Sequence, residues 1–93
     1  MSFAIRWSPR AARDLAGIAQ FIGEDSADQA QLVAASIYER LSALANFPNI
    51  GRKGRLAGTR ELVLAPLPFI VVYRVAETTI DVVRILHGAQ KWP

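Results

Sequence analysis

The last third of the sequence is divided into three short strand-like runs with very short links between them. The runs cover residues 61–64, 69–76 and 80–87 and are rich in β-branched and aromatic side chains, which favour extended structure. Antiparallel neighbours can be joined by a tight turn, whereas parallel neighbours need a crossover of a dozen or more residues. Links as short as residues 65–68 and 77–79 therefore predict an antiparallel meander.

The middle run of this meander, residues 69–76, is apolar at both alternating sets of positions apart from Arg74. A strand that shows one face to water alternates apolar and polar residues, so this run is typical of a central strand covered on both faces. We expect helices to cover one face and another part of the chain to shield the other.

The first part of the chain shows the pattern of a strand followed by a helix. Residues 3–7 alternate apolar with small or polar side chains, the period of a half-buried strand. Ser8 can cap a helix through its side-chain oxygen, and Pro9 suits the first helical position. We expect this helix to end at residues 23–25. Its apolar stripe consists of Ala11, Leu15, Ile18, Ala19 and Ile22.

A second helix follows at once, because Ser26 and Gln29 have the spacing of a capping box. We expect it to end at residues 46–48, since a proline disfavours helical geometry in the residue before it. Its apolar stripe consists of Ala30, Val33, Ile37, Leu41 and Leu44. Tyr38 lies off this stripe and belongs either to the edge of the core or to a contact surface; we favour the core.

The expected order of elements is β-α-α-β-β-β, in a single domain covering residues 1–93. Because a helix and a sheet each bury one apolar face, the two helices should form a hairpin that packs on the sheet. The sequence thus predicts an α+β fold, in which a small antiparallel sheet carries a two-helix hairpin on one face.

The composition excludes several classes of protein. Hydrophobic residues make up 52% of the 93 residues, yet no apolar run approaches the roughly 20 residues that cross a bilayer, so no membrane contact is expected. There is no cysteine and a single histidine, so neither a metal site nor another cofactor is expected. Residues 1–9 lack the apolar segment of a signal peptide, which predicts a cytoplasmic protein. The surplus of apolar residues indicates a protein partner.

The net charge of +3 is unevenly distributed along the chain. Residues 1–51 carry four arginines against five acidic residues, whereas residues 52–93 carry seven basic residues against three acidic ones, so the two parts have charges of −1 and +4. A positive segment attracts phosphates or an acidic polypeptide without choosing between them. Ordinary solubilising charge is the alternative explanation.

Two segments of the basic part are candidates for binding. Residues 49–58 combine three glycines with Arg52, Lys53 and Arg55, which is typical of a mobile basic loop. The C-terminal residues 90–93 read Gln-Lys-Trp-Pro, and an exposed tryptophan beside a lysine would be a natural centre of binding energy. This tryptophan could instead fold back over the edge of the sheet, and the sequence leaves both alternatives open.

Three segments of the meander carry a resemblance to a known family. They are Gly-Thr-Arg-Glu-Leu at residues 58–62, Val-Val-Tyr-Arg-Val at residues 71–75 and Ile-Leu-His at residues 85–87. With the order of elements, they make the chain resemble the RelE/ParE toxins of bacterial type II toxin-antitoxin systems, which inhibit growth and serve in plasmid stabilization.

The resemblance implies that a cognate antitoxin neutralises the toxin. Antitoxins of this family have a DNA-binding part and an acidic amphipathic tail that orders on the toxin, covers apolar grooves and pairs with basic residues. Arg60, Arg74 and Arg84 are the candidate antitoxin-binding residues. Operator DNA would be bound only through the antitoxin.

One branch of the family cleaves messenger RNA on the ribosome without a metal, through attack of a ribose 2′-hydroxyl on the adjacent phosphate. This chemistry needs cations beside the phosphate and a group that exchanges protons near neutral pH. The nuclease candidates are Arg60, Arg84 and His87. We favour the structural alternative, in which such arginines pair with acids such as Glu61 or Asp81 and the histidine is a packing residue.

The positions where the cleaving branch is expected to place cations hold other residues here, namely Glu61, Val63, Ile70 and Gln90. None of these side chains can neutralise a phosphate. The closing Ile-Leu-His resembles instead the ParE branch, whose members bind DNA gyrase and do not cleave RNA.

We therefore expect a toxin that is not an enzyme and that binds gyrase. Its candidate target-binding residues are Arg52, Lys53, Arg55, Lys91 and Trp92. The alternatives are a ribosome-dependent endoribonuclease acting on messenger RNA and a degenerate toxin that only binds its antitoxin.

Overall fold

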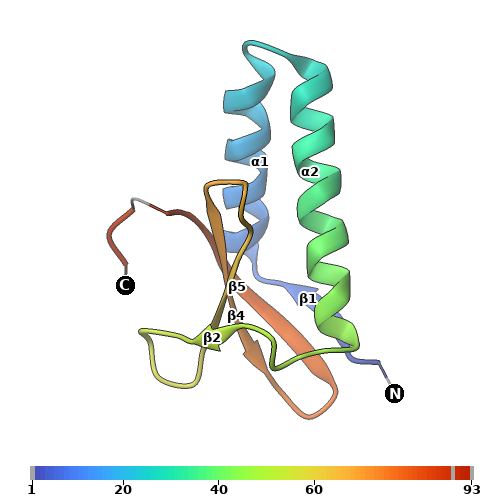
Figure 1. Ribbon diagram of the computed structural model, residues 1–93, viewed down its shortest axis with the longest axis vertical. Helices are drawn as coiled ribbons and strands as arrows, with labels where there is room; N and C mark the ends of the chain where they lie inside the picture. The colour runs from blue at the N-terminus through green and yellow to red at the C-terminus, as the bar shows by residue number, and fades with distance from the viewer. Residues whose placement is uncertain (1, 89, 93) are drawn as a thin grey trace.

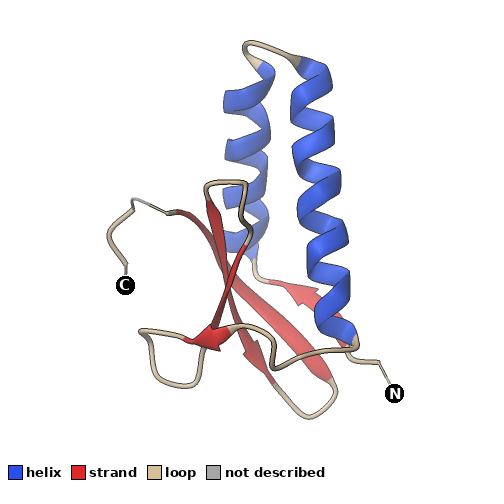
Figure 2. Cartoon of the chain, viewed as in Figure 1, coloured by secondary structure: helices blue, strands red, loops and turns tan. Residues whose placement is uncertain are grey.

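A two-helix hairpin stands on one face of a five-stranded sheet in the computed structural model, which describes residues 2–88 and 90–92 (Figures 1 and 2). The elements in chain order are β1 (Ala4–Trp7), α1 (Pro9–Gly23), α2 (Ala27–Ser42), the short 3-10 helix η1 (Ala43–Ala45), β2 (Arg52–Lys53), β3 (Arg60–Val63), β4 (Phe69–Val75) and β5 (Thr79–His87). The predicted α+β fold is confirmed.

The strands are arranged in the order β1-β5-β4-β3-β2, so β4 is the central strand, as its apolar pattern predicts. Strands β3, β4 and β5 form the predicted antiparallel meander. Strand β1 pairs parallel to β5, so the sheet is mixed and not wholly antiparallel. The short turns of the meander dictate antiparallel pairing only for the strands that they join. Strand β1 is connected to the meander through the long helical hairpin, and a connection of this length allows parallel pairing with β5.

The interpretation of residues 49–58 as a loop is incomplete, because this segment contains the two-residue strand β2. Arg52 pairs with Glu61 and Lys53 pairs with Arg60 in an antiparallel register. A pair of residues is too short to show the alternation by which strands are recognised in a sequence. The sheet therefore has one edge strand more than predicted.

Both predicted helix starts are confirmed by their caps. The Ser8 hydroxyl accepts a hydrogen bond from the backbone N–H of Ala11 at 2.9 Å, and the Ser26 hydroxyl accepts one from the backbone N–H of Gln29 at 3.1 Å. Each bond satisfies a donor that has no partner within the first turn of a helix. Helix α2 passes directly into η1, which ends just before the predicted stop at residues 46–48.

One hydrophobic core fills the space between the hairpin and the sheet. It contains most of the apolar stripe of each helix and alternate residues of the central strands, which turn one face toward the helices. Its most buried side chains include Ala11, Ile37, Leu41, Leu44, Leu64, Val71, Tyr73, Ile80 and Val82.

The prediction that Tyr38 belongs to the core is wrong. Its side chain is 54% exposed, and its ring lies 5.3 Å from the ring of Trp7. Successive side chains on an α-helix are turned by about 100°, so the fully buried Ile37 takes the core position and its neighbour faces outward. The two aromatic rings form a pair at the surface between β1 and α2.

Tyr73 fastens the segment before β2 to the sheet. Its side chain is fully buried, and its hydroxyl donates to the carbonyl of Pro48 at 2.8 Å and accepts from the backbone N–H of Gly51 at 2.9 Å. Burial raises the pKa of Tyr73 above its usual 10.0, although the hydrogen bond from Gly51 and the nearby charge of Arg60 act in the opposite direction. A Cβ on Gly51 would lie 2.6 Å from the hydroxyl oxygen, so only glycine fits there.

Replacement of Tyr73 by phenylalanine should lower the free energy of unfolding by about 1–3 kcal/mol, because two desolvated backbone groups lose their partner. Urea denaturation would measure the change. The matched control is Tyr38→Phe, which removes an exposed hydroxyl and should change stability by less than about 0.5 kcal/mol. Equal stability of Tyr73→Phe and the unmodified chain would show that the hydroxyl is not needed.

Candidate functional site on the second sheet face and along helix α1

The face of the sheet turned away from the helices carries a row of side chains that crosses four strands. The register pairs Arg52 with Glu61, Glu61 with Val72, and Val72 with Arg84. Directly paired residues of adjacent strands point to the same face, and Val71, next to Val72, points into the helical core. We call the four residues from Arg52 to Arg84 the cross-strand row.

The C-terminal tail folds over this row. The ring of Trp92 lies 5.5 Å from the guanidinium carbon of Arg84, in the range of a cation–π contact, and Arg55 donates from Nη1 to the carbonyl of Trp92 at 3.0 Å. The Trp92 side chain is half-buried, between the two alternatives that the sequence leaves open. Its indole N–H is buried and makes no hydrogen bond within residues 2–88 and 90–92.

Glu61 is the electrostatic centre of the cross-strand row. Its buried carboxylate accepts hydrogen bonds at Oε1 from Nε and Nη2 of Arg52, at 3.2 and 3.0 Å, and at Oε2 from the backbone N–H of Arg55, at 3.1 Å. Burial raises the pKa of Glu61, but these hydrogen bonds and the two positive charges outweigh burial and hold the pKa below its ordinary 4.5. Glu61 thereby fixes both β2 and the loop that follows it.

Three of the five predicted target-binding residues, Arg52, Arg55 and Trp92, come together around this network. Arg52 and Arg55 share the carboxylate of Glu61, and Arg55 is bound to the tail. Lys53 is exposed on the edge strand β2, and Lys91 is exposed in the tail. We call the set the basic surface; it consists of Arg52, Lys53, Arg55, Lys91 and Trp92. Pro93, part of the predicted C-terminal segment, lies outside the described residues.

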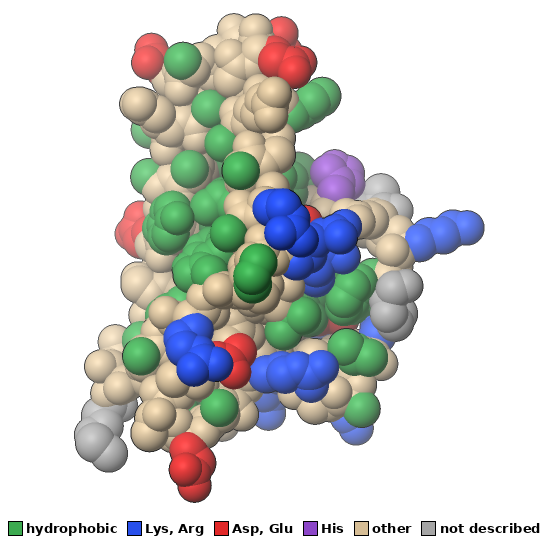
Figure 3. All heavy atoms as spheres, turned by 180° about the vertical axis from the view of Figure 1, so that it is seen from behind, with side chains coloured by type: hydrophobic (Ala, Val, Ile, Leu, Met, Phe, Trp, Pro, Cys, Tyr) green, Lys and Arg blue, Asp and Glu red, His purple; other side chains and the backbone are tan. Residues whose placement is uncertain are grey.

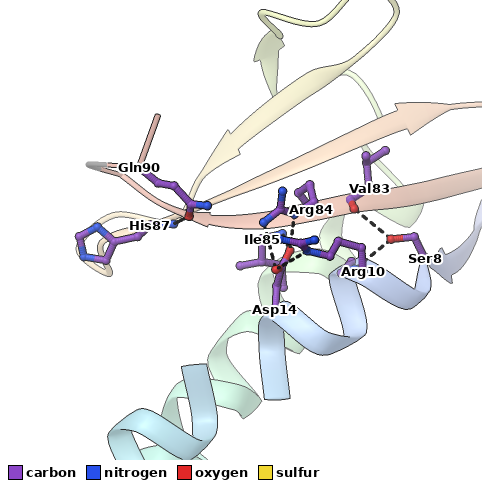
Figure 4. A network of polar contacts seen from close by, with 9 residues as sticks. Ser8, Arg10, Asp14, Val83, Arg84, Ile85, His87 and Gln90 are labelled. Carbon is purple, nitrogen blue, oxygen red and sulfur yellow. Dashed lines mark hydrogen bonds and ion pairs between the residues drawn. The ribbon is translucent and has the colours of Figure 1, made fainter. Parts of the chain in front are cut away.

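Asp14 of α1 completes the edge of β5 where β1 ends. Strand β1 pairs with β5 only as far as Val82, so the backbone beyond this point has no neighbouring strand on that side. Ser8 donates from its hydroxyl to the carbonyl of Val83 at 2.9 Å, and Asp14 accepts at Oδ2 from the backbone N–H of Ile85 at 2.9 Å (Figure 4). Side chains thus replace the missing strand.

The same carboxylate holds Arg84. Arg84 donates from Nε and Nη2 to the two oxygens of Asp14, at 2.8 and 3.2 Å, and the two side chains are only 14% and 11% exposed. Arg10 lies at the same carboxylate, 3.5 Å away, and is largely exposed (Figure 4). A two-point contact of this kind fixes the orientation of the guanidinium group.

The three predicted antitoxin-binding arginines do not form one cluster. Arg60 donates from Nη1 to the carbonyl of Gly51 at 2.8 Å. Arg74 donates from Nη1 to the carbonyl of Ala57 at 3.2 Å. Arg84 is held by α1, so each of the three is bound to a different part of the chain.

Arg84 is engaged in an ion pair, as the structural alternative predicts, although its partner is neither of the acids given as examples. Arg84 pairs with Asp14 and not with Glu61 or Asp81. Asp81 pairs instead with the exposed Arg6, at 3.1 Å. The sequence could not indicate the true pair, because its two members are 70 residues apart.

The nuclease candidates are not gathered around one phosphate position. Arg60 is paired with Tyr73 and His87 with Phe69, and these two partners are four residues apart on β4. Four residues of strand span about 13 Å. Arg84, the third candidate, is committed to its ion pair, and the ring of His87 forms a T-shaped contact with the ring of Phe69, with 6.1 Å between the ring centres. The described part of the chain holds no group of three or more acidic or histidine side chains placed to bind a metal ion.

A groove that no sequence pattern predicts runs along α1, beside the turn between β3 and β4 and the end of β5. It has a volume of about 620 Å³ and is lined by Arg10, Arg13, Asp14, Gly17, Ile18, Phe21, Ile22, Val33, Leu67, Pro68, Phe69, Arg84, Ile85, His87 and Gln90. Phe21 is 74% exposed although aromatic. Figure 3 shows basic side chains gathered beside the single histidine. We call this feature the α1 groove.

Comparisons with known proteins agree with this geometry. Residues 5–92 match the family described as the ParE toxin of the type II toxin-antitoxin system parDE. The protein Y4kP of Sinorhizobium fredii is 43% identical over 89 residues, covering 96% of this chain and 92% of its own length. Toxin RelE2 of Caulobacter vibrioides is 38% identical over 84 residues, covering 90% of this chain and 93% of its own length.

Two solved structures share the fold. A chain of the chromosomal ParDE system from P. aeruginosa has a TM-score of 0.82 and 26% identity, covering 92% of this chain and 96% of that one. A chain of the RelBE2 toxin-antitoxin complex from Mycobacterium tuberculosis has a TM-score of 0.68 and 21% identity, covering 94% and 99%. The chain therefore belongs to the RelE/ParE family and is the toxin of a type II toxin-antitoxin system. The predicted family is confirmed.

Among the described residues, neither helix has the length and apolar character needed to span a bilayer.

The lowered pKa of Glu61 makes a prediction about acid stability. A carboxyl group whose pKa is lower in the folded chain stabilises the fold above its unfolded pKa, near 4.5, and that contribution is lost as the pH falls through the folded value. Glu61→Gln should therefore be less stable than the unmodified chain at pH 7 and should lose less stability between pH 6 and pH 3. Urea denaturation across this range would measure both slopes.

The matched control for this experiment is Glu77→Gln, because Glu77 is an exposed carboxyl in the turn between β4 and β5. It should keep the acid slope of the unmodified chain. A slope for Glu61→Gln as steep as that of the control would contradict the role given to Glu61.

Proposed function

We propose that this toxin, acting as one domain of residues 1–93 in the cytoplasm, arrests growth by binding DNA gyrase through the basic surface. The carrying observation is the chemistry of the second sheet face. At the positions where cleavage would require free cations, this sheet face carries Glu61, Val63 and Ile70. Glu61 is already paired with Arg52. Such a face suits binding and not phosphate chemistry.

The contacts available on the basic surface support a binding role. Lys53 and Lys91 are exposed and make no ion pair within the described residues, so their charges are available to an acidic partner. Trp92, held by Arg55 and Arg84, supplies a large ring next to Lys91 in the chain. Aromatic and arginine side chains at the centre of a contact, with charged residues around them, are typical of binding hot spots. The match to parDE toxins favours the gyrase-binding branch.

A ribosome-dependent endoribonuclease acting on messenger RNA is the second candidate, because the 38% identical relative is named toxin RelE2. Under this alternative His87, which is exposed at the end of β5, would exchange protons during cleavage.

We also propose that the cognate antitoxin places an acidic amphipathic tail in the α1 groove. Its apolar side chains would cover Phe21 and Phe69, and its acidic side chains would meet the exposed Arg10 and Arg13, which line the same groove. Burial of an apolar face with charge pairing at its edge is the usual way in which a disordered segment orders on a partner. Of the predicted antitoxin-binding arginines, Arg84 alone lines this groove. Operator DNA would be reached through the antitoxin.

The gyrase proposal is tested by reversing the charges of Lys53 and Lys91 together. Lys53→Glu with Lys91→Glu should weaken the inhibition of gyrase supercoiling by about tenfold or more, because like charges would face an acidic target. Growth arrest should weaken in parallel. The matched control is Arg6→Glu, a reversal on β1 at a side chain that is 70% exposed, which should leave inhibition unchanged.

His87→Gln separates the two candidate functions, because a binder should still arrest growth without an imidazole. Rapid cleavage of messenger RNA in a translating extract by the unmodified toxin, together with its loss in His87→Gln, would overturn the gyrase proposal in favour of the nuclease.

The antitoxin proposal is tested with two exposed phenylalanines. Phe21→Asp puts a charge into the α1 groove and should weaken antitoxin binding by about 100-fold, as expected when a large apolar contact is lost and a charge is desolvated. Phe47→Asp is the matched control, because Phe47 is 62% exposed and is not among the groove residues. Calorimetry with the antitoxin would measure both; equal affinities would place the antitoxin elsewhere.

A further inference from the structure

Two arginines hold Trp92 in different ways. Arg55 donates to the backbone carbonyl of Trp92 at 3.0 Å, whereas the guanidinium carbon of Arg84 lies 5.5 Å from the centre of the indole ring. The first contact places the main chain of the tail and leaves the side chain free to turn about its own bonds. The second contact acts on the ring itself, and a cation over an aromatic face favours one orientation of that face. The direction in which the ring points therefore depends on where Arg84 is held.

The position of Arg84 is set from the first helix by Asp14. Nε and Nη2 of Arg84 donate to the two carboxylate oxygens at 2.8 and 3.2 Å, and the two side chains are 14% and 11% exposed. A contact at two points fixes the plane of the guanidinium group, whereas a single hydrogen bond would let it turn. Water and salt screen a contact this deeply buried only weakly. The Asp14 carboxylate thus determines how the guanidinium faces the indole ring.

The other acids of the sheet are not placed to replace Asp14. Glu61 belongs to the same cross-strand row, but it lies two strands away from Arg84, a separation of about 10 Å, and its carboxylate is occupied by Arg52. Asp81 lies on β5 itself and has an ion pair of its own. Within residues 2–88 and 90–92, Asp14 is the acid that pairs with Arg84. Loss of this carboxylate would therefore leave the guanidinium without a fixed orientation.

We propose, on the basis of the proposed target-binding role of Trp92, that Asp14 is a positioning residue for the basic surface. Acting through Arg84, it holds the indole ring in the orientation that the target binds. Asp14 is not part of the basic surface and lines the α1 groove. A ring that is already oriented loses less conformational freedom on binding than a mobile one, a difference of about threefold to tenfold in affinity for one side chain.

A double-variant cycle with Trp92→Leu tests the positioning role in the full chain. Asp14→Asn keeps an oxygen for the backbone N–H of Ile85 but removes the charge and the second acceptor that hold Arg84. It should raise the amount of toxin needed to arrest growth by about threefold to tenfold, and by less than about twofold when Trp92 is already leucine. Equal losses in both backgrounds would overturn the proposal, because a carboxylate that only stabilises the fold would matter equally in both.

The indole N–H of Trp92 reports the position of the ring directly, whatever the target is. This N–H is buried, so it should exchange slowly with deuterated water in nuclear magnetic resonance spectra. The chain has two tryptophans, and the indole signal that is missing from Trp92→Leu identifies the right one. Asp14→Asn should speed the exchange by about tenfold, as expected when a local opening becomes easier. An unchanged exchange rate would overturn the proposal.

Arg84→Lys alters the other member of the pair and should speed the exchange in the same way, because an ammonium group cannot make the two-point contact. Asp81→Asn is the matched control: it removes the other ion pair of β5, with Arg6, and should change neither exchange nor growth arrest. Circular dichroism would confirm that each variant is folded. Full growth arrest by Trp92→Leu would overturn the target-binding role of the ring, and the exchange rate would then decide separately whether Asp14 orients it.

Discussion

A single helical carboxylate, that of Asp14, stands where a neighbouring strand would otherwise continue along β5. It accepts hydrogen bonds from the backbone N–H of Ile85 and from Nε and Nη2 of Arg84, so it connects the first helix to the last strand at a point where β1 has already ended. Without it, a nearly buried guanidinium and an edge N–H would both need water. The position of α1 over the sheet, and with it the shape of the α1 groove, depends on this contact.

Much of the fold could be predicted because its signals are local. Ser8 and Ser26 act on backbone groups three residues away, and the meander strands alternate within a few residues, so both are readable in the sequence. The strand β2 was missed because two residues are too few to show a period, and it is held by Glu61 on the neighbouring strand β3. The exposure of Tyr38 could not be predicted, because the helical period shows which residues form the apolar stripe but not whether a residue at its edge is buried.

The candidate site was predicted in its composition more than in its arrangement. The basic loop and the tail were identified separately, and the contact between Arg55 and Trp92 that joins them spans 37 residues, a distance over which no local pattern operates. The α1 groove had no periodic signal, because its lining comes from two helices, a turn and a strand. Within the basic surface, Arg52 is bound to Glu61 and Arg55 to Glu61 and the tail, which leaves Lys53 and Lys91 as its cations that are not engaged within the described residues.

The two tryptophans of this chain sit in different electrostatic surroundings. Trp7 packs against the ring of Tyr38 at the surface between β1 and α2, whereas Trp92 lies against the guanidinium of Arg84, and its indole N–H is buried without a hydrogen bond to the described residues. Indole emission depends on nearby charge and on exposure to water, so the two rings should differ in wavelength and in quenching. Each tryptophan is therefore an intrinsic fluorescent probe of its own surface. In Trp7→Phe or Trp92→Phe the fluorescence of the remaining tryptophan could be measured alone.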